Sequence, residues 1–170
     1  GWNPAVPATM PAENPTLVAQ WTVNQYTLTY TAGENGSVDG KPQVVQVVLH
    51  GRDAGPVTAI PAEGHRFDQW SDGVATATRA DTNVDDNLDV TAGFEAKWVP
   101  AITWPVPDAI IYGTPLSTAQ LNATANTPGA FVYTPPTGTV LGAGPGQELE
   151  VDFAPTDGGN WVATSATQTI

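Results

Sequence analysis

An acidic segment near the middle of the chain carries oxygen-bearing side chains at the spacing of a calcium loop. Asp81, Asn83, Asp85 and Asp89 match the oxygen ligands at relative positions 1, 3, 5 and 9 of an EF-hand. The sixth position, however, holds Asp86 where the loop needs glycine, and the twelfth holds Ala92 where it needs a bidentate glutamate. No helical pattern flanks the segment. We therefore predict a solvated turn over residues 81–89, with weak adventitious calcium binding as the alternative.

His50 and His65 are the two side chains that could serve as a general base or as a nitrogen ligand near neutral pH. His50 precedes Gly51 at the end of an apolar stripe, and His65 stands in the stretch Gly64-His65-Arg66-Phe67. Neither has a cysteine or a carboxylate at the spacing that metal sites use. A structural or solvent-exposed role is predicted for both.

Nucleophilic catalysis has no support in the sequence. The four serines are Ser37, Ser71, Ser117 and Ser165, and none lies in a Gly-x-Ser-x-Gly elbow. The glycine-rich residues 142–146 are interrupted by Pro145 and lead into a strand, so they are no phosphate loop. Carboxylate pairs would need a deep cleft, which small modules rarely supply. The sequence predicts no enzyme activity, no catalytic residue, no cofactor and no metal site.

Tryptophans at exposed positions would suggest a platform for sugar binding. Five of the six, namely Trp21, Trp70, Trp98, Trp104 and Trp161, each belong to a motif or an apolar stripe, so core packing is predicted for them. Trp2 is the least constrained. Lys97 alternates with Phe94, Ala96 and Trp98 along one strand and should face water, which argues against a buried isopeptide bond.

Charge and composition exclude several classes of partner. The 170 residues include 17 acidic and 5 basic side chains, a net charge of −12, so nucleic acid and anionic membrane surfaces are not expected partners. The absence of cysteine excludes disulfides and thiol catalysis. No apolar run approaches the roughly 18 residues that span a bilayer. The chain opens at Gly1-Trp2 without methionine and is expected to be an excised piece.

The elements that must position these residues are short strands. Residues 88–98 alternate between apolar and polar types over their whole length, with Gly93 at an expected bend. Further stripes are Tyr26, Leu28 and Tyr30, and then Val45, Val47 and Leu49. Turn signals separate the strands at residues 33–36, 39–40 and 71–73. With 17 glycines and 16 prolines spread evenly, the chain should contain almost no helix, at most a turn or two at residues 117–121.

The composition of the sequence changes after Val99-Pro100: no basic residue follows, and prolines become frequent. Strands are predicted at residues 110–112, 131–133, 149–153 and 161–164, a spacing typical of a β-sandwich. We place a domain boundary at residues 99–101. The core expected before it holds Tyr26, Leu28, Val47, Phe67, Phe94 and Trp98. The core expected after it holds Ile102, Trp104, Tyr112, Phe131, Leu149, Val151, Phe153 and Trp161.

Three resemblances follow from these motifs. Residues 1–23, with Gly1-Trp2-Asn3 and Ala19-Gln20-Trp21, resemble the closing half of a Listeria–Bacteroides repeat of the internalin B type. Residues 24–99 resemble a divergent internalin B-repeat, through Tyr30-Thr31-Ala32-Gly33, Trp70-Ser71-Asp72-Gly73 and Thr91-Ala92-Gly93-Phe94. Residues 100–170 are similar to an immunoglobulin-like bacterial repeat, through Ile102-Thr103-Trp104, Tyr112-Gly113-Thr114-Pro115 and Phe153-Ala154-Pro155-Thr156-Asp157.

The resemblances imply an all-β chain of tandem small modules, in which a β-grasp-like mixed-sheet repeat precedes an immunoglobulin-like β-sandwich. They imply an extracellular location on a bacterial cell surface. They also imply a structural role as a spacer in a large adhesin-like protein, with neighbouring repeats as partners. The alternative is a module that binds a glycan or a protein, in a surface adhesin or in a secreted multi-module enzyme that degrades polysaccharides.

Overall fold

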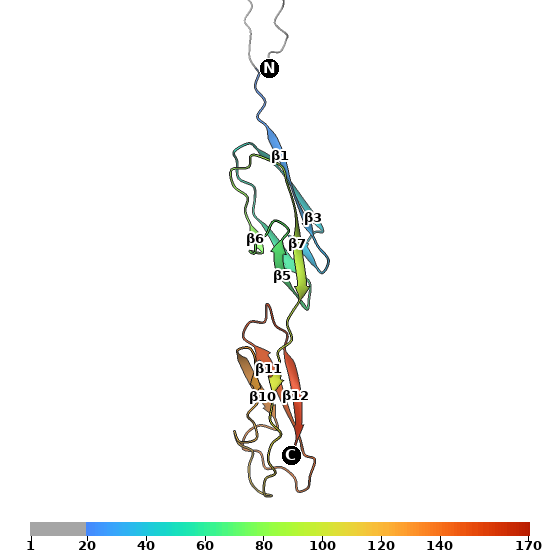
Figure 1. Ribbon diagram of the computed structural model, residues 1–170, viewed down its shortest axis with the longest axis vertical. Coiled ribbons are helices and arrows are strands. Elements are labelled where there is room, and N and C mark those ends of the chain that lie inside the picture. Colours follow the sequence, from blue (N-terminus) through green and yellow to red (C-terminus); the bar gives the residue numbers. More distant parts are fainter. Residues whose placement is uncertain (1–19) are drawn as a thin grey trace, which may run out of the picture. The chain divides into compact units, whose positions relative to one another are not determined.

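The computed structural model describes residues 20–170 (Figure 1). The truncated repeat predicted for residues 1–23 therefore lies almost wholly outside the described residues. The described chain forms two compact units. The first holds the residues up to Ile60 together with Gln69–Gly93, and the second holds Pro61–Asp68 together with Phe94–Ile170. The domain boundary at residues 99–101 remains a prediction.

A four-stranded sheet has the strand order β3-β1-β7-β5. Strand β1 (Gln25–Ala32) pairs antiparallel with β3 (Gln43–Leu49) and parallel with β7 (Leu88–Ala96), while β5 (His65–Trp70) lies at the far edge. The sheet is therefore mixed, as predicted. The turn after β2 has Asp39 and Gly40 at positive φ, 49° and 74°, in keeping with the predicted Asp-Gly turn.

A three-stranded sheet of order β2-β4-β6 accompanies the first one. It is built from β2 (Gly36–Val38), β4 (Val57–Pro61) and the short β6 (Thr78–Arg79). Residues from both sheets are fully buried, among them Leu28 and Tyr30 of β1, Val38 of β2 and Val57 of β4.

The second unit contains a three-stranded antiparallel sheet and a two-stranded one. The strands are β8 (Ile102–Thr103), β9 (Thr124–Ala125), β10 (Gly129–Thr134), β11 (Glu148–Pro155) and β12 (Thr164–Thr169), arranged as β8-β9 and β10-β11-β12. Leu149 and Val151 of β11 are fully buried and pack with Trp104, Leu116 and Leu121. The described residues contain strands and turns but no helix, and residues 117–121, where at most a turn or two of helix was expected, form a hydrogen-bonded turn.

Several predicted details are wrong. Val47 points to solvent from β3, and Trp98 and Tyr112 are exposed. Residues 110–112 form no strand. Prolines 105, 107 and 115 around them lack the N–H that a sheet ladder needs, so a short apolar run there becomes a loop.

Candidate functional site

The two histidines lie in separate structural settings. The ring of His50 packs against Tyr26 at a centroid distance of 5.8 Å, and His65 Nδ1 lies 3.0 Å from the carbonyl oxygen of Glu63. Among residues 20–170, no group of three or more histidine, cysteine or carboxylate side chains is placed to hold a metal ion.

Two side chains of the acidic turn, Asp81 and Asn87, accept hydrogen bonds within the protein. The Asp81 carboxylate accepts hydrogen bonds from Arg79 Nη2 at 2.6 Å and from the Tyr30 hydroxyl at 2.7 Å. Asn87 Oδ1 accepts the backbone N–H of Thr27 at 2.8 Å, next to the first strand of the sheet. The first EF-hand position therefore points to Arg79, and the turn fastens β1 beside the start of β7.

Arg79 is the centre of a partly buried polar cluster that was not apparent from the sequence. We call Arg79 together with Tyr30, Trp70, Asp72 and Asp81 the Arg79 cluster. Its guanidinium contacts Asp81 on one side and Asp72 Oδ2 at 3.0 Å on the other. It also lies 5.2 Å from the centroid of the Trp70 ring, which is fully buried. An arginine between two carboxylates and an aromatic face is held in one orientation, so this cluster is structural.

The charges in the Arg79 cluster shift the pKa values of its members. Burial by itself raises the pKa of Asp81, but the hydrogen bonds from Arg79 and Tyr30 outweigh it and the net shift is downward from 3.8. Because the folded state then favours the carboxylate, the stability that Asp81 contributes is present at pH values above its ordinary pKa of 3.8. That contribution is lost as the pH falls through the lowered pKa.

The first unit should also lose stability at alkaline pH. Burial, and then the hydrogen bond to Asp81, raise the pKa of Tyr30 above its ordinary 10.0. The folded state favours the neutral phenol. The stability that Tyr30 contributes is therefore complete below pH 10.0 and is lost as the pH rises through the folded-state pKa. A Tyr30→Phe chain should be about 0.5–1.5 kcal/mol less stable than the native chain at neutral pH. The difference should shrink as the pH rises.

Urea unfolding of the first unit, followed from neutral to strongly alkaline pH, measures this difference. The matched control is Tyr26→Phe, a half-buried tyrosine on the same strand. A Tyr30→Phe chain whose deficit stays constant at all pH values would contradict the assignment.

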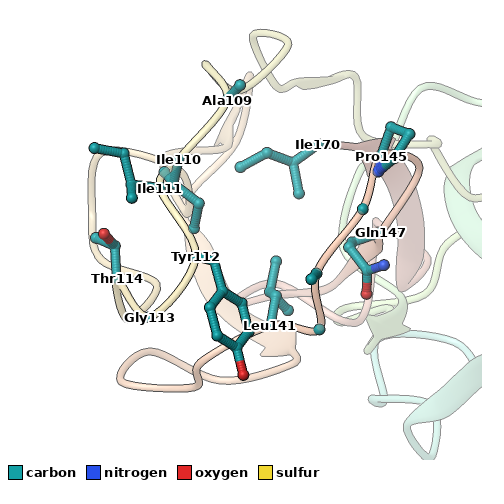
Figure 2. Close-up of a pocket in the computed structure, with 13 residues that line it drawn as sticks. Ala109, Ile110, Ile111, Tyr112, Gly113, Thr114, Leu141, Pro145, Gln147 and Ile170 are labelled. Carbon is teal, nitrogen blue, oxygen red and sulfur yellow. The ribbon is translucent and has the colours of Figure 1, made fainter.

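A pocket of about 310 Å³ opens at one end of the second unit (Figure 2). Two loops form its sides, one at residues 109–114 and the other at residues 141–147. Figure 2 shows the side chains of Leu141, from the second loop, and of Ile170 in the space between the loops. Ile110, Leu141 and Ile170 pack onto the hydrophobic core, so the floor of the pocket continues that core. The backbone N–H of Gln147 donates to the Ile170 carbonyl at 3.1 Å and ties the second loop to the end of β12.

The lining of this pocket limits what it can do. Its polar side chains are those of Tyr112, Thr114 and Gln147, and no charged residue lines it. The pocket is therefore suited to holding an apolar group.

A second set of contacts surrounds Trp98 within the second unit. The Trp98 N–H donates to the Asn160 carbonyl at 2.9 Å, and the Val162 N–H donates to the Trp98 carbonyl at 3.0 Å. The rings of Trp98 and Trp161 lie 5.3 Å apart, and the Arg66 guanidinium lies 4.1 Å from the Trp98 ring centroid. We call Arg66, Trp98, Asn160, Trp161 and Val162 the Trp98 junction.

Neighbouring polar groups hold the chain on both sides of the Trp98 junction. Lys97 Nζ donates to the Gly158 carbonyl at 2.6 Å, so this ammonium is engaged by a neighbouring loop instead of being wholly solvated as predicted. Asp157 Oδ2 accepts from Asn160 Nδ2 at 2.8 Å and fixes the turn that presents Asn160. The hydrogen bonds that Asp157 accepts from the side chain and the backbone of Asn160 lower its pKa.

The tryptophans divide into buried and exposed groups. Trp70 and Trp104 are buried as predicted, and Trp161 is half-buried. Trp98 is 47% exposed and Trp21 is 85% exposed, so the prediction of core packing is wrong for these two. Each closes a stretch that reads as a strand, but Trp98 lies beyond the last residue of β7 and Trp21 precedes β1.

The segment that contains the sheet of order β3-β1-β7-β5 matches a known family. The match ends at Trp98, two residues after the end of β7. Residues 26–98 match the family model described as Divergent InlB B-repeat domain. This segment is similar to a divergent InlB B-repeat, and we refer to it below as the InlB B-repeat. No curated protein and no solved structure matches the chain.

The predicted resemblance of residues 24–99 is thus confirmed, and the InlB B-repeat contains both the Arg79 cluster and the residues of β1 and β3. Repeats of this family are typical of bacterial surface proteins. The described residues contain no helix that could cross a membrane.

Proposed function

We propose that this chain is a non-catalytic spacer from an exported bacterial surface protein, in which the InlB B-repeat is followed by an immunoglobulin-like module. Its partners are the neighbouring repeats of the same protein, and its place is the extracellular face of the cell. No residue has a catalytic, cofactor-binding or metal-binding role in this proposal.

The observation that carries the proposal is the Trp98 junction. A linker between modules bends freely unless its backbone is hydrogen bonded. Here Trp98, the last residue of the InlB B-repeat, forms a parallel β-bridge with Trp161. Its backbone N–H and C=O are hydrogen bonded to Asn160 and Val162, the two neighbours of Trp161. Pro100 follows two residues later and restricts Val99 to extended geometry. A linker restrained in this way favours a spacer that transmits force over one that hinges.

Replacing Trp98 by alanine should loosen this connection. The substitution removes the ring contact with Trp161 and the stacking of Arg66, each worth about 0.5–1.5 kcal/mol. In hydrogen exchange, the amides of Trp98 and Val162 should be protected in the native chain. In the variant, exchange at position 98 and at Val162 should be about tenfold faster or more.

Residual dipolar couplings test the mechanical consequence. One alignment tensor should fit the amides of residues 26–98 and 100–170 in the native chain, while the Trp98→Ala chain should require two. The matched control is Trp21→Ala, which makes the same chemical change at an exposed tryptophan outside the Trp98 junction. Two tensors for the native chain would refute the spacer proposal.

The competing function is a binding module for a glycan or a protein. The apolar pocket between residues 109–114 and 141–147 and the exposed ring of Trp98 favour it. Glycan arrays and calorimetry with the full chain distinguish the two functions. Micromolar binding that is lost on Tyr112→Ala or Trp98→Ala would favour the binding module over the spacer.

A further inference from the structure

Strand β3 is an open edge of the four-stranded sheet. It pairs with β1 on one side, and within residues 20–170 no strand follows it on the other. The hydrogen bonds from His50 to Asn24 and from Ala32 to Pro42 show which residues bond inward. Since bonding alternates along an antiparallel ladder, the N–H and C=O groups of Val45 and Val47 point away from β1. These groups can be satisfied by another strand.

The side chains of Val45 and Val47, together with that of Leu49, form an exposed apolar row. Val45 is 53% exposed, Val47 is 64% exposed and Leu49 is 41% exposed. The registered neighbours on β1 are threonines, with Thr29 beside Val45 and Thr27 beside Val47. The outer surface at this edge is therefore β-branched and uncharged.

The usual protection of an edge strand is missing from β3. Edge strands in soluble proteins commonly carry a lysine, a proline, a bulge or an inward-pointing charge that blocks pairing. The opposite edge of this sheet, β5, carries Arg66 and Asp68, and Arg66 is ion-paired with Glu95. Strand β3 runs seven residues without a charge or a proline.

The central five residues of β3 read the same in both directions about Gln46. Residues 44–48 are Val-Val-Gln-Val-Val. An antiparallel copy centred on Gln46 would place Val45 opposite Val47 twice, and both residues have outward backbone groups. Every hydrogen-bonded pair then joins two residues whose backbone groups face away from β1. The pairs next to Gln46 on the outer face are valine with valine, and the flanking pairs are Gln43 with Leu49.

We infer that β3 is a self-association surface, which joins two copies of this chain edge to edge about a two-fold axis at Gln46. A second copy fits because residues 44–48 are their own complement in register and apolar pattern, and because no like-charge pair arises within the strand. The net charge of −12 on each chain opposes association, so the dimer is weak and strengthens as salt screens the repulsion. The inference does not depend on the spacer role.

Sedimentation velocity on the full chain, from micromolar to millimolar concentration and at low and high salt, tests the inference. The native mass should rise from monomer toward dimer with concentration and with salt. Amide exchange at Val45 and Val47 should slow in parallel, while exchange at Val44 and Val48 changes little.

Two variants address the edge itself. Val47→Lys places a charge on the outer row, and Val45→Pro removes an N–H that points away from β1, so it leaves the β1–β3 ladder bonds in place. Both should stay monomeric at every concentration. Val132→Lys is the matched control, because Val132 is a 62% exposed valine on β10 of the second unit. Protected amides along β1 show that each variant is folded.

Three outcomes overturn the inference. The native chain could remain monomeric at millimolar concentration and high salt, with Val45 and Val47 amides unprotected. Dimerisation could persist in both folded variants, which would place the contact elsewhere. The two amides could become protected only after a strand from another protein is added, which would make β3 a site for a foreign strand.

Discussion

An Arg79→Met chain should lose up to about 3 kcal/mol of unfolding free energy in its first unit, because the substitution leaves the partly buried Asp81 carboxylate and the more exposed Asp72 carboxylate without their cation. Arg79 is only 6% exposed, and its guanidinium contacts Asp72 and Asp81 within 3.0 Å. Methionine fills much of the space beside Trp70 but cannot neutralise two carboxylates. Urea unfolding monitored by tryptophan fluorescence measures the loss.

Two further chains isolate the cause of that loss. Arg52→Met removes an exposed arginine of the same unit and should change stability by less than about 1 kcal/mol. Adding Asp81→Asn to Arg79→Met removes one of the stranded charges and should recover part of the stability. An Arg79→Met chain that is as stable as the Arg52→Met chain would show that the cluster contributes nothing.

The sequence predicted the strands whose two faces differ. Residues 88–98 alternate apolar and polar types, and the structure has β7 over Leu88–Ala96, ending two residues earlier. Tyr26, Leu28 and Tyr30 lie on the inner side of β1, because threonines separate them. Turns with Gly, Asp and Asn were also predictable, since they need positive φ, as at Asn35 and Gly73.

Strand β3 could not be oriented from its sequence. Both of its faces are apolar, so either Val44 and Val48 or Val45 and Val47 could face the core. Register decides, because Tyr26 pairs with Val48 and Tyr30 with Val44, and these tyrosines are on the buried side. The sequence prediction placed Val47 in the core and thereby missed the open edge.

The polar and apolar sites depended on contacts distant in sequence. Arg79 meets Tyr30 through Asp81, so only the tertiary structure shows why this arginine is buried. The pocket of the second unit combines two loops with Ile170, and residues 110–112 were mistaken for a strand because Ile-Ile-Tyr has high β propensity. Residues 81–87 lie outside any strand, whereas Leu88 and Asp89, which the prediction included in the turn, begin β7.

A Trp104→Ala chain should lose about 3–5 kcal/mol in the second unit and leave the first unit unchanged. Trp104 is buried against Leu116, Leu121 and Leu149, so its removal leaves a large cavity. Its Nε1–H also donates to the Gln120 carbonyl at 2.9 Å, and that acceptor would lose its partner. Native-state hydrogen exchange reports each unit separately, through the amides of Leu28 and Val90 in one and of Val151 and Phe153 in the other.

The same experiment tests the predicted boundary at residues 99–101. If residues 100–170 form a module with its own core, the Trp104→Ala substitution speeds exchange at Val151 and Phe153 by more than a hundredfold, which corresponds to the expected loss at about 1.4 kcal/mol per factor of ten. Exchange at Leu28 and Val90 then stays at its native rate, as it does in the Trp21→Ala control. If all four amides lose protection together, the two cores unfold as one cooperative unit, and the boundary does not separate independent modules.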